Sequence, residues 1–364
     1  MKNILLSLMS NTTGLLATAA SLFFCVQQHA AAQDALPVSD GASYYLPKTE
    51  LSFSLLVEKT AYTPGDFAKY ASRYLRRDDV RLTPSTEYRI IGIRLSQKAV
   101  PDTAKFFTAR IDAKHSIRSL KRDENGVLLA INAEGRTAKP KEPFTAAPKP
   151  ATVNPRDYMT QEILSAGNEM KMAELCVQEI YDIRENKGLL NKGQADFMPK
   201  DGEQLRLMIS NLDTQERALL QLFEGTTQKD TAETEVTFVP TREVEKQLLF
   251  RFSKHFGLTD ADDLSGRPYY IKIDDLHSSP TLDDGIADPK KEKDNIGIYV
   301  ALPGKIRATV FSQEQTLGAF ELYAPQFGTV EPLSGELFGK KFTSHLVLNP
   351  LTGSIDSIET ETIK

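Results

Sequence analysis

The sequence predicts an α+β fold in which a β-rich N-terminal unit and a C-terminal antiparallel β unit, a sandwich or barrel, flank a long antiparallel helical hairpin. Apolar residues recur every three or four positions over residues 155–225, which indicates the hairpin. Short segments of alternating polarity, bounded by turn residues, precede and follow that stretch. The composition, 40% hydrophobic and 26% charged in 364 residues, is that of a folded globular protein.

Residues 1–32 carry the features of a secretory signal peptide. Lys2 supplies the positive start, residues 15–26 form an apolar run, and residues 30–32 are the small residues that signal peptidase requires. A membrane-spanning helix needs about 20 apolar residues, so cleavage near Ala32 is favoured over an anchor. We therefore expect an exported protein, periplasmic or secreted to the cell surface, with no transmembrane anchor after cleavage.

Charge gives no support for a nucleic-acid partner. Without Lys2, the only charged residue in the signal peptide, 43 basic residues stand against 49 acidic ones. Cleavage would also remove Cys25 and leave Cys176 as the only cysteine, which excludes an intramolecular disulfide. Cys176 lies in a strongly helical segment, where a lone cysteine is typical of a small core residue rather than a nucleophile.

The N-terminal unit is expected over residues 33–135. Leu51, Phe53, Leu55 and Val57 alternate with polar residues, which predicts a strand with one apolar face. A short helix is predicted after the turn at residues 63–66, and several further strands follow it, including a hairpin. Residues 136–154 are expected to form a linker. Prolines, alanines and lysines are closely spaced there, and apolar residues no longer recur at helix or strand spacing.

The helical hairpin is expected over residues 155–225. Asn154 and Pro155 start the first helix, which should run to Gly188. Asp201 caps the second helix, and Gly225 ends it. The apolar positions of the two helices are Met159, Ile163, Ala166, Met170, Ala173, Val177 and Ile180, then Leu205, Met208, Ile209, Leu212, Leu219, Leu222 and Phe223.

Polar residues interrupt the apolar stripe of the second helix at Gln215 and Glu216. Two interpretations stay open. In the first, these side chains face solvent where the neighbouring element ends, which the rarity of buried charges favours. In the second, a buried Glu216 pairs with a cation such as Arg184 and sets the register of the two helices.

The C-terminal antiparallel β unit is expected over residues 226–364. Its sequence contains a series of short strands separated by turn signals. The predicted strands are residues 234–239, 246–253, 268–273, 296–302, 305–311, 316–323, 342–348 and 354–359.

No motif predicts a catalytic residue, a cofactor or a firm metal site. The sequence contains no nucleophile elbow, no H-E-x-x-H, no C-x-x-C and no phosphate-binding loop. Asp260, Asp262 and Asp263 are weak candidates for calcium, since carboxylate oxygens on a loop suit that ion. Leu264 stands where a further oxygen ligand belongs, which favours a solvated turn.

Several short motifs, in order along nearly the whole mature chain, resemble those of an exported family of unknown function from Bacteroidetes-type bacteria. The resemblance implies a source and a location but no activity or site residue. It is carried by Tyr44-Tyr45-Leu46-Pro47-Lys48-Thr49, residues 62–71, Arg73-Tyr74-Leu75, Ile183-Arg184-Glu185, Pro199-Lys200-Asp201-Gly202, residues 222–225, Arg251-Phe252-Ser253, Leu264-Ser265-Gly266-Arg267-Pro268 and Gln326-Phe327-Gly328.

Two classes of function remain. The first is a non-catalytic protein of the cell envelope that binds a protein, peptide or glycan partner through its sheets or its hairpin. The alternative is an extracytoplasmic glycan or peptide hydrolase that uses carboxylates of the loops at residues 260–294. Missing nucleophile and metal motifs favour the binding protein, although converging carboxylates leave no local signature.

Overall fold

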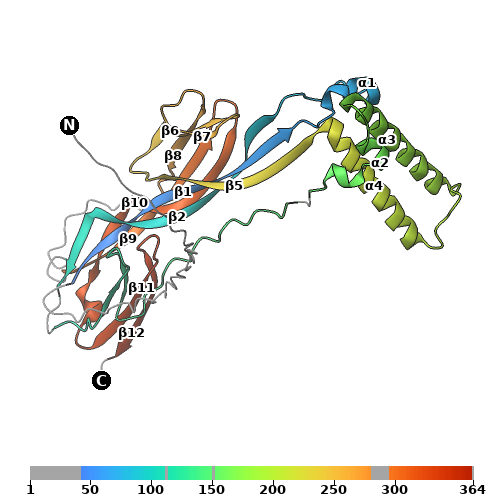
Figure 1. Cartoon of the computed structure of the whole chain (residues 1–364). Helices are drawn as coiled ribbons and strands as arrows, with labels where there is room; N and C mark the ends of the chain where they lie inside the picture. Colours follow the sequence, from blue (N-terminus) through green and yellow to red (C-terminus); the bar gives the residue numbers. More distant parts are fainter. Residues whose placement is uncertain (1–41, 111–113, 150–151, 280–294, 363–364) are drawn as a thin grey trace, which may run out of the picture. The chain divides into compact units, whose positions relative to one another are not determined.

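The computed structural model describes residues 42–110, 114–149, 152–279 and 295–362. The signal peptide expected at residues 1–32 lies outside these ranges. The described chain is built from three antiparallel sheets and a pair of long helices, which confirms the α+β class (Figure 1). No helix among the described residues combines the length and the apolar character needed to cross a membrane.

The first sheet joins strands that precede and follow the helical region. Its order is β2-β1-β5, with β1 (Ala42–Thr63), β2 (Ser85–Ala109) and β5 (Thr226–Phe238). β1 pairs with β2 along nearly its whole length, and its second half pairs with β5. The 3-10 helix η1 (Ala68–Tyr70) and the short helix α1 (Ala71–Leu75) connect β1 to β2.

A five-stranded sheet packs against the apolar face of the first sheet. Its order is β10-β9-β8-β6-β7, with β6 (Val244–Ser253), β7 (Gly257–Thr259), β8 (Arg267–Asp275), β9 (Asn295–Phe311) and β10 (Thr316–Ser334). Leu51, Phe53 and Leu55 of β1 are fully buried in the core between the two sheets. Neither sheet closes on itself among the described strands, so the layers form a sandwich rather than the barrel that the sequence left as an alternative.

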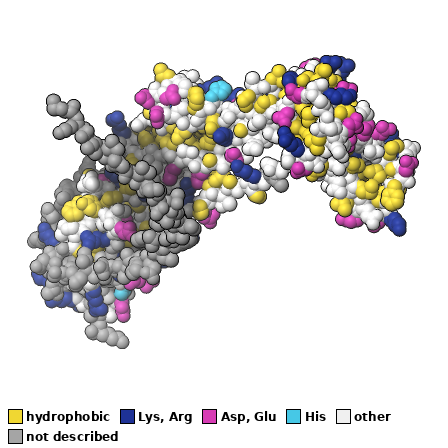
Figure 2. All heavy atoms as spheres, viewed as in Figure 1, with side chains coloured by type: hydrophobic (Ala, Val, Ile, Leu, Met, Phe, Trp, Pro, Cys, Tyr) yellow, Lys and Arg dark blue, Asp and Glu magenta, His cyan; other side chains and the backbone are white. Residues whose placement is uncertain are grey.

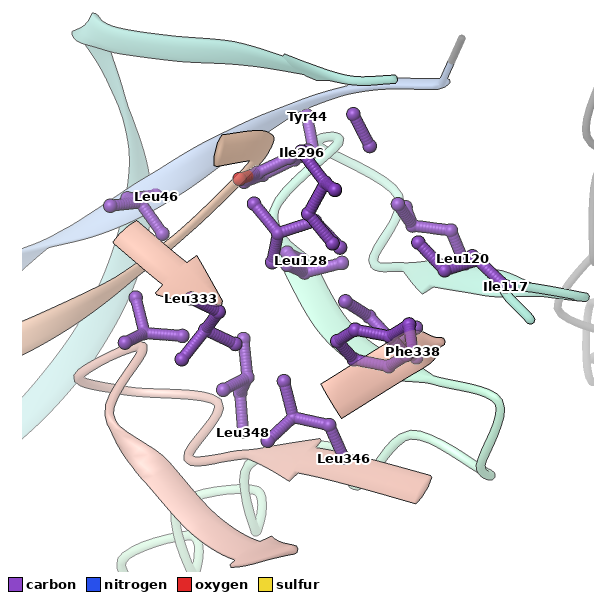
Figure 3. Packing of buried hydrophobic residues seen from close by; sticks show 14 residues of the cluster. Tyr44, Leu46, Ile117, Leu120, Leu128, Ile296, Leu333, Phe338, Leu346 and Leu348 are labelled. Carbon is purple, nitrogen blue, oxygen red and sulfur yellow. The ribbon is translucent and has the colours of Figure 1, made fainter. Parts of the chain in front are cut away.

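The third sheet combines strands from both ends of the chain. Its order is β12-β11-β4-β3, with β3 (Leu120–Arg122), β4 (Leu128–Ile131), β11 (Phe342–Leu348) and β12 (Ile355–Thr362). Its core includes Tyr44, Leu128, Phe338 and Leu346, with Phe338 supplied by the 3-10 helix η3 (Gly335–Phe338) (Figure 3). The ranges 33–135 and 226–364 therefore share strands in two of the three sheets.

The helical region begins with two short helices, η2 (Pro155–Tyr158) and α2 (Gln161–Leu164). The long helices α3 (Glu169–Lys192) and α4 (Gly202–Glu224) then pack against each other. The single first helix expected from residue 155 to Gly188 was wrong at both ends. The Asn168 side chain caps α3 by accepting from Lys171 N, and the left-handed Gly193 ends it, so Gly188 lies inside the helix.

Two glycines let the backbone of the helical region approach the first sheet closely. A Cβ atom on Gly65, just after β1, would lie 2.2 Å from the Leu222 carbonyl oxygen. Gly225, between α4 and β5, has φ +76°, and its Cβ would lie 2.3 Å from the Thr63 oxygen. Phe67 N also donates to Leu222 O at 2.6 Å. The C-terminal end of α4 thus contacts the backbone at the C-terminal end of β1 directly.

Candidate functional site

The half of the α3–α4 pair nearest the sheets has a closed apolar core. We call residues 169–183 and 217–224 the proximal half. The buried side chains of the two helices include Cys176, Ile180, Leu219 and Phe223. They are covered by Phe67 from the turn before η1, Ala71 from α1 and Ile163 from α2. Burial raises the pKa of the Cys176 thiol to about 12, so the thiolate is disfavoured. The geometry makes Cys176 a packing residue.

Four charged side chains separate this core from the rest of the pair, and we call them the polar layer. Arg184 Nε lies 2.6 Å from Glu216 Oε1, and Lys187 Nζ lies 2.8 Å from Glu216 Oε2. Lys187 also pairs with Asp213. The structure thus brings together Arg184 and Glu216. It adds two partners, Lys187 and Asp213, each three residues away on its own helix, that no sequence pattern indicated.

Glu216 is nearly covered by its partners, with 14% of its side chain exposed. Burial acts to raise the pKa of its carboxyl, but the hydrogen bonds from Lys187 and Arg184 together outweigh burial and hold that pKa below its ordinary value. The ionised carboxylate therefore bridges the two helices. Glu216 pairs with Arg184 as the second interpretation describes, and the effect of this pair on the register of the helices stays a prediction.

Beyond the polar layer, residues 188–212 form the distal half, where Leu190 alone is buried. Leu189, Leu205, Met208, Ile209 and Leu212 are only half-buried. Three large apolar side chains are exposed: Phe197 (77%), Met198 (37%) and Leu207 (63%). Figure 2 shows hydrophobic side chains gathered on the visible face of this end of the pair.

The exposed apolar tip was not predicted from the sequence. A signal was nevertheless present, since Phe197 and Met198 stand side by side in the loop between the two helices.

The weak calcium candidates lie in the turn between β7 and β8. The Asp263 carboxylate accepts a hydrogen bond from Ser265 N at 2.9 Å. The side chain of Ser265, followed by this backbone N–H, lowers the pKa of Asp263. Asp263 N in turn donates to the Asp260 carbonyl oxygen, as in a solvated turn. In the described part of the chain, no three acidic, histidine or cysteine side chains gather as a metal site, Asp260, Asp262 and Asp263 included.

Two cavities lie along the first sheet. One, of about 820 Å³, is lined by Lys149, Thr152, Val153 and Pro155 on one side and by the junction of α4 with β5 on the other. The second, of about 460 Å³, lies under residues 137–141. Three of the carboxylates that line them have partners: Asp230 pairs with Lys149, Glu235 accepts from Ser52, and Asp123 accepts backbone N–H groups at its own turn. Asp66 also lines the larger cavity.

Comparison with known proteins gives a family and no activity. Residues 40–356 match the family described as "Domain of unknown function (DUF4831)". No curated protein and no solved structure matches the chain.

Proposed function

The chain belongs to the DUF4831 family of unknown function, and on that premise we propose that it is an exported, non-catalytic protein of the cell envelope that binds a protein partner. The distal half of the α3–α4 pair is the proposed docking surface. The observation that carries the proposal is the exposure of Phe197, Met198 and Leu207 at the end of a helix pair whose inner residues are only half-buried. Export rests on the signal features of residues 1–32.

The proximal half indicates what the distal half lacks. In the proximal half, the two helices are covered by a third layer that supplies Phe67, Ala71 and Ile163. In the distal half, Leu205, Met208 and Ile209 recur at helical spacing, and none of the three belongs to the buried cluster that the third layer covers. An amphipathic helix from a partner would complete that layer, which is the helix-in-groove mode of recognition.

Charge favours a protein over an anionic membrane as the occupant. Exposed residues of both charges flank the apolar tip: Lys192, Lys200, Asp196, Asp201 and Glu203. A membrane-binding surface would instead carry an excess of lysine and arginine. A mixed rim of this kind is typical of protein–protein interfaces.

The test is site-specific photo-crosslinking in the cells that produce the protein. A photoreactive phenylalanine analogue replaces Phe197 in one variant and Leu264, which is 82% exposed in the β7–β8 turn, in the control. We expect one discrete protein adduct from position 197, none from position 264, and loss of the adduct when Met198→Asp is added. Identical patterns at both positions, an adduct that survives Met198→Asp, or no adduct would each contradict the proposal.

A further inference from the structure

A proline-rich segment lies along the first sheet without becoming part of it. Residues 136–149, which we call the strap, contain no helix or strand. Within the described residues, no hydrogen bond involves the strap backbone. Its prolines favour an extended polyproline conformation, in which little backbone entropy is lost on binding. The strap therefore contacts the sheet in the way that a bound peptide would, through side chains.

The sheet face beside the strap is polar. Ser52 and Ser54 of β1 point away from the apolar core, and they are only 3% and 1% exposed. Their neighbours across the β1–β5 pairing include Glu235 opposite Ser54 and Glu233 opposite Leu56. Water would satisfy the hydroxyls and carboxylates of this face if the strap left. Leu56 shares the face, and Leu129, Pro350 and Leu351 line the cavity beside the strap, so the groove also offers apolar contacts.

Lysines hold the strap in place. Lys141 Nζ lies 2.9 Å from Glu233 Oε1 and also donates to Ser54 Oγ. The hydrogen bond from Lys141, followed by that from Ser54, lowers the pKa of Glu233. Further along β5, Lys149 Nζ lies 2.5 Å from Asp230 Oδ1. Both lysine side chains are more than a third exposed, so salt screens these pairs and weakens them.

The strap also leaves part of this face unfilled. The cavity of about 460 Å³ is bounded by strap residues on one side and by Ser52, Ser96 and Glu235 on the other. The larger cavity, of about 820 Å³, begins where the strap ends at Lys149. Both volumes are in the range of ligand pockets.

We infer that the polar face of the β2-β1-β5 sheet is a binding groove for an extended peptide that contains proline and lysine, and that the strap occupies this groove as an internal ligand. Glu233 and Ser54 recognise the lysine of the peptide, and the groove opens when the strap is displaced. This site is separate from the distal half of the helix pair, and either can exist without the other.

The experiment replaces residues 137–149 by a Gly/Ser segment of equal length in the full chain. A fluorescent peptide with the sequence of residues 136–149 is then titrated into this variant and into the wild-type chain, with anisotropy as the readout. We expect the variant to melt cooperatively near the wild-type temperature and to bind the peptide at least about tenfold more tightly than wild type, since the strap no longer competes. A peptide with Lys141→Glu should bind at least about tenfold more weakly.

A charge swap tests the recognition itself. In the strap-replaced chain, Glu233→Lys should weaken binding of the native peptide and restore binding of the Lys141→Glu peptide. The matched control is Glu321→Lys, since Glu321 pairs with Lys305 and Arg307 on the five-stranded sheet and should leave both affinities unchanged. A folded strap-replaced chain that binds neither peptide, or binds both equally, overturns the inference.

A second measurement uses chains that keep the strap, in case the replacement prevents folding. Tryptic cleavage after Lys141, the strap lysine that no proline follows, is measured at low and high salt, with a free strap peptide to correct for the salt response of trypsin. Cleavage should accelerate at least about threefold at high salt, because screening releases the lysines. Glu233→Gln should accelerate it at low salt. A strap whose corrected cleavage rate responds to neither change is not held by these pairs, and the inference fails.

Discussion

The proximal and distal halves of the α3–α4 pair are built from the same two helices but differ in how they are covered. In the proximal half, eleven buried residues form one core, which includes residues from the turn before η1, from α1 and from α2. In the distal half, Leu190 is the one buried residue, the other residues of the apolar stripe are half-buried, and Leu207 is exposed. A two-helix layer cannot bury its own apolar side chains fully, and a third element decides whether they become core or surface.

The polar layer lies where that change occurs. Arg184, Lys187, Asp213 and Glu216 satisfy one another between the helices, so the boundary carries paired charges instead of exposed apolar side chains. Pairs of this kind add less stability than apolar packing of the same volume. The helix pair thus consists of a packed half, a layer of paired charges and an open half, and a role of that layer in setting the register of the two helices stays a prediction.

Cysteine reactivity should differ most between the two halves. Cys176 is fully buried and its thiol pKa is raised, so the native thiol should react only through local unfolding. In a Cys176→Ser background, a cysteine placed at half-buried Leu212 should react at least about a hundredfold faster. Labelling is quantified peptide by peptide, so that Cys25 does not contribute. Equal rates at positions 176 and 212 would show that the two halves are equally open.

Truncation of apolar side chains should show the next largest difference. Phe223 is fully buried and packs on Phe67, with ring centroids 5.5 Å apart, so Phe223→Ala should lower the free energy of unfolding by about 3–5 kcal/mol. Leu205→Ala in the distal half should cost about 1 kcal/mol, because that side chain already faces solvent in part. Urea unfolding followed by circular dichroism suits a chain without tryptophan. A cost at Leu205 as large as at Phe223 would mean that the distal half is also closed.

The polar layer should give the smallest effect, with a distinctive pH dependence. Glu216→Gln should lower the free energy of unfolding by about 1 kcal/mol near neutral pH, after allowance for solvent screening. The folded-state pKa of Glu216 lies below the unfolded value of about 4.3, so its contribution is complete above that value. The contribution is lost as the pH falls through the folded-state pKa.

The control for this experiment is Glu203→Gln, since the Glu203 side chain is 89% exposed and lies 3.9 Å from Arg206 in the distal half. No measurable change in stability is expected there. A difference between wild type and Glu216→Gln that persists unchanged to low pH would exclude an ionised Glu216 as its source.

Sequence patterns located the helix pair well but placed its first helix poorly. The Asp201 cap and the stop at Gly225 define α4 as predicted, since both act through bonds to neighbouring residues. Gly188 was expected to end α3, yet a glycine inside a helix costs only about 1 kcal/mol, which packing of α3 against α4 can offset. Gly193 ends α3 instead, and nothing local to Gly188 distinguishes it from such a stop.

The sequence could not predict which distant strands pair with each other. Leu346 of β11 pairs with Ile131 of β4, and the two residues are separated by most of the described chain. Alternation of polarity shows that each segment is a strand with a buried face, but it holds no information about which strand lies beside it. The two β-rich ranges therefore looked like consecutive units, whereas the structure interleaves their strands.

The sequence by itself determined the local elements of this protein: the apolar face of β1, the capped helix α4, the apolar stripes of the helix pair and the lack of helix or strand in the strap. These follow from interactions within a few residues, so periodicity and turn residues are sufficient to predict them. Only the tertiary structure decided which part of the helix pair is core and which is surface. The covering residues Phe67 and Ala71 lie about a hundred residues before α3, and burial depends on which surfaces meet in space.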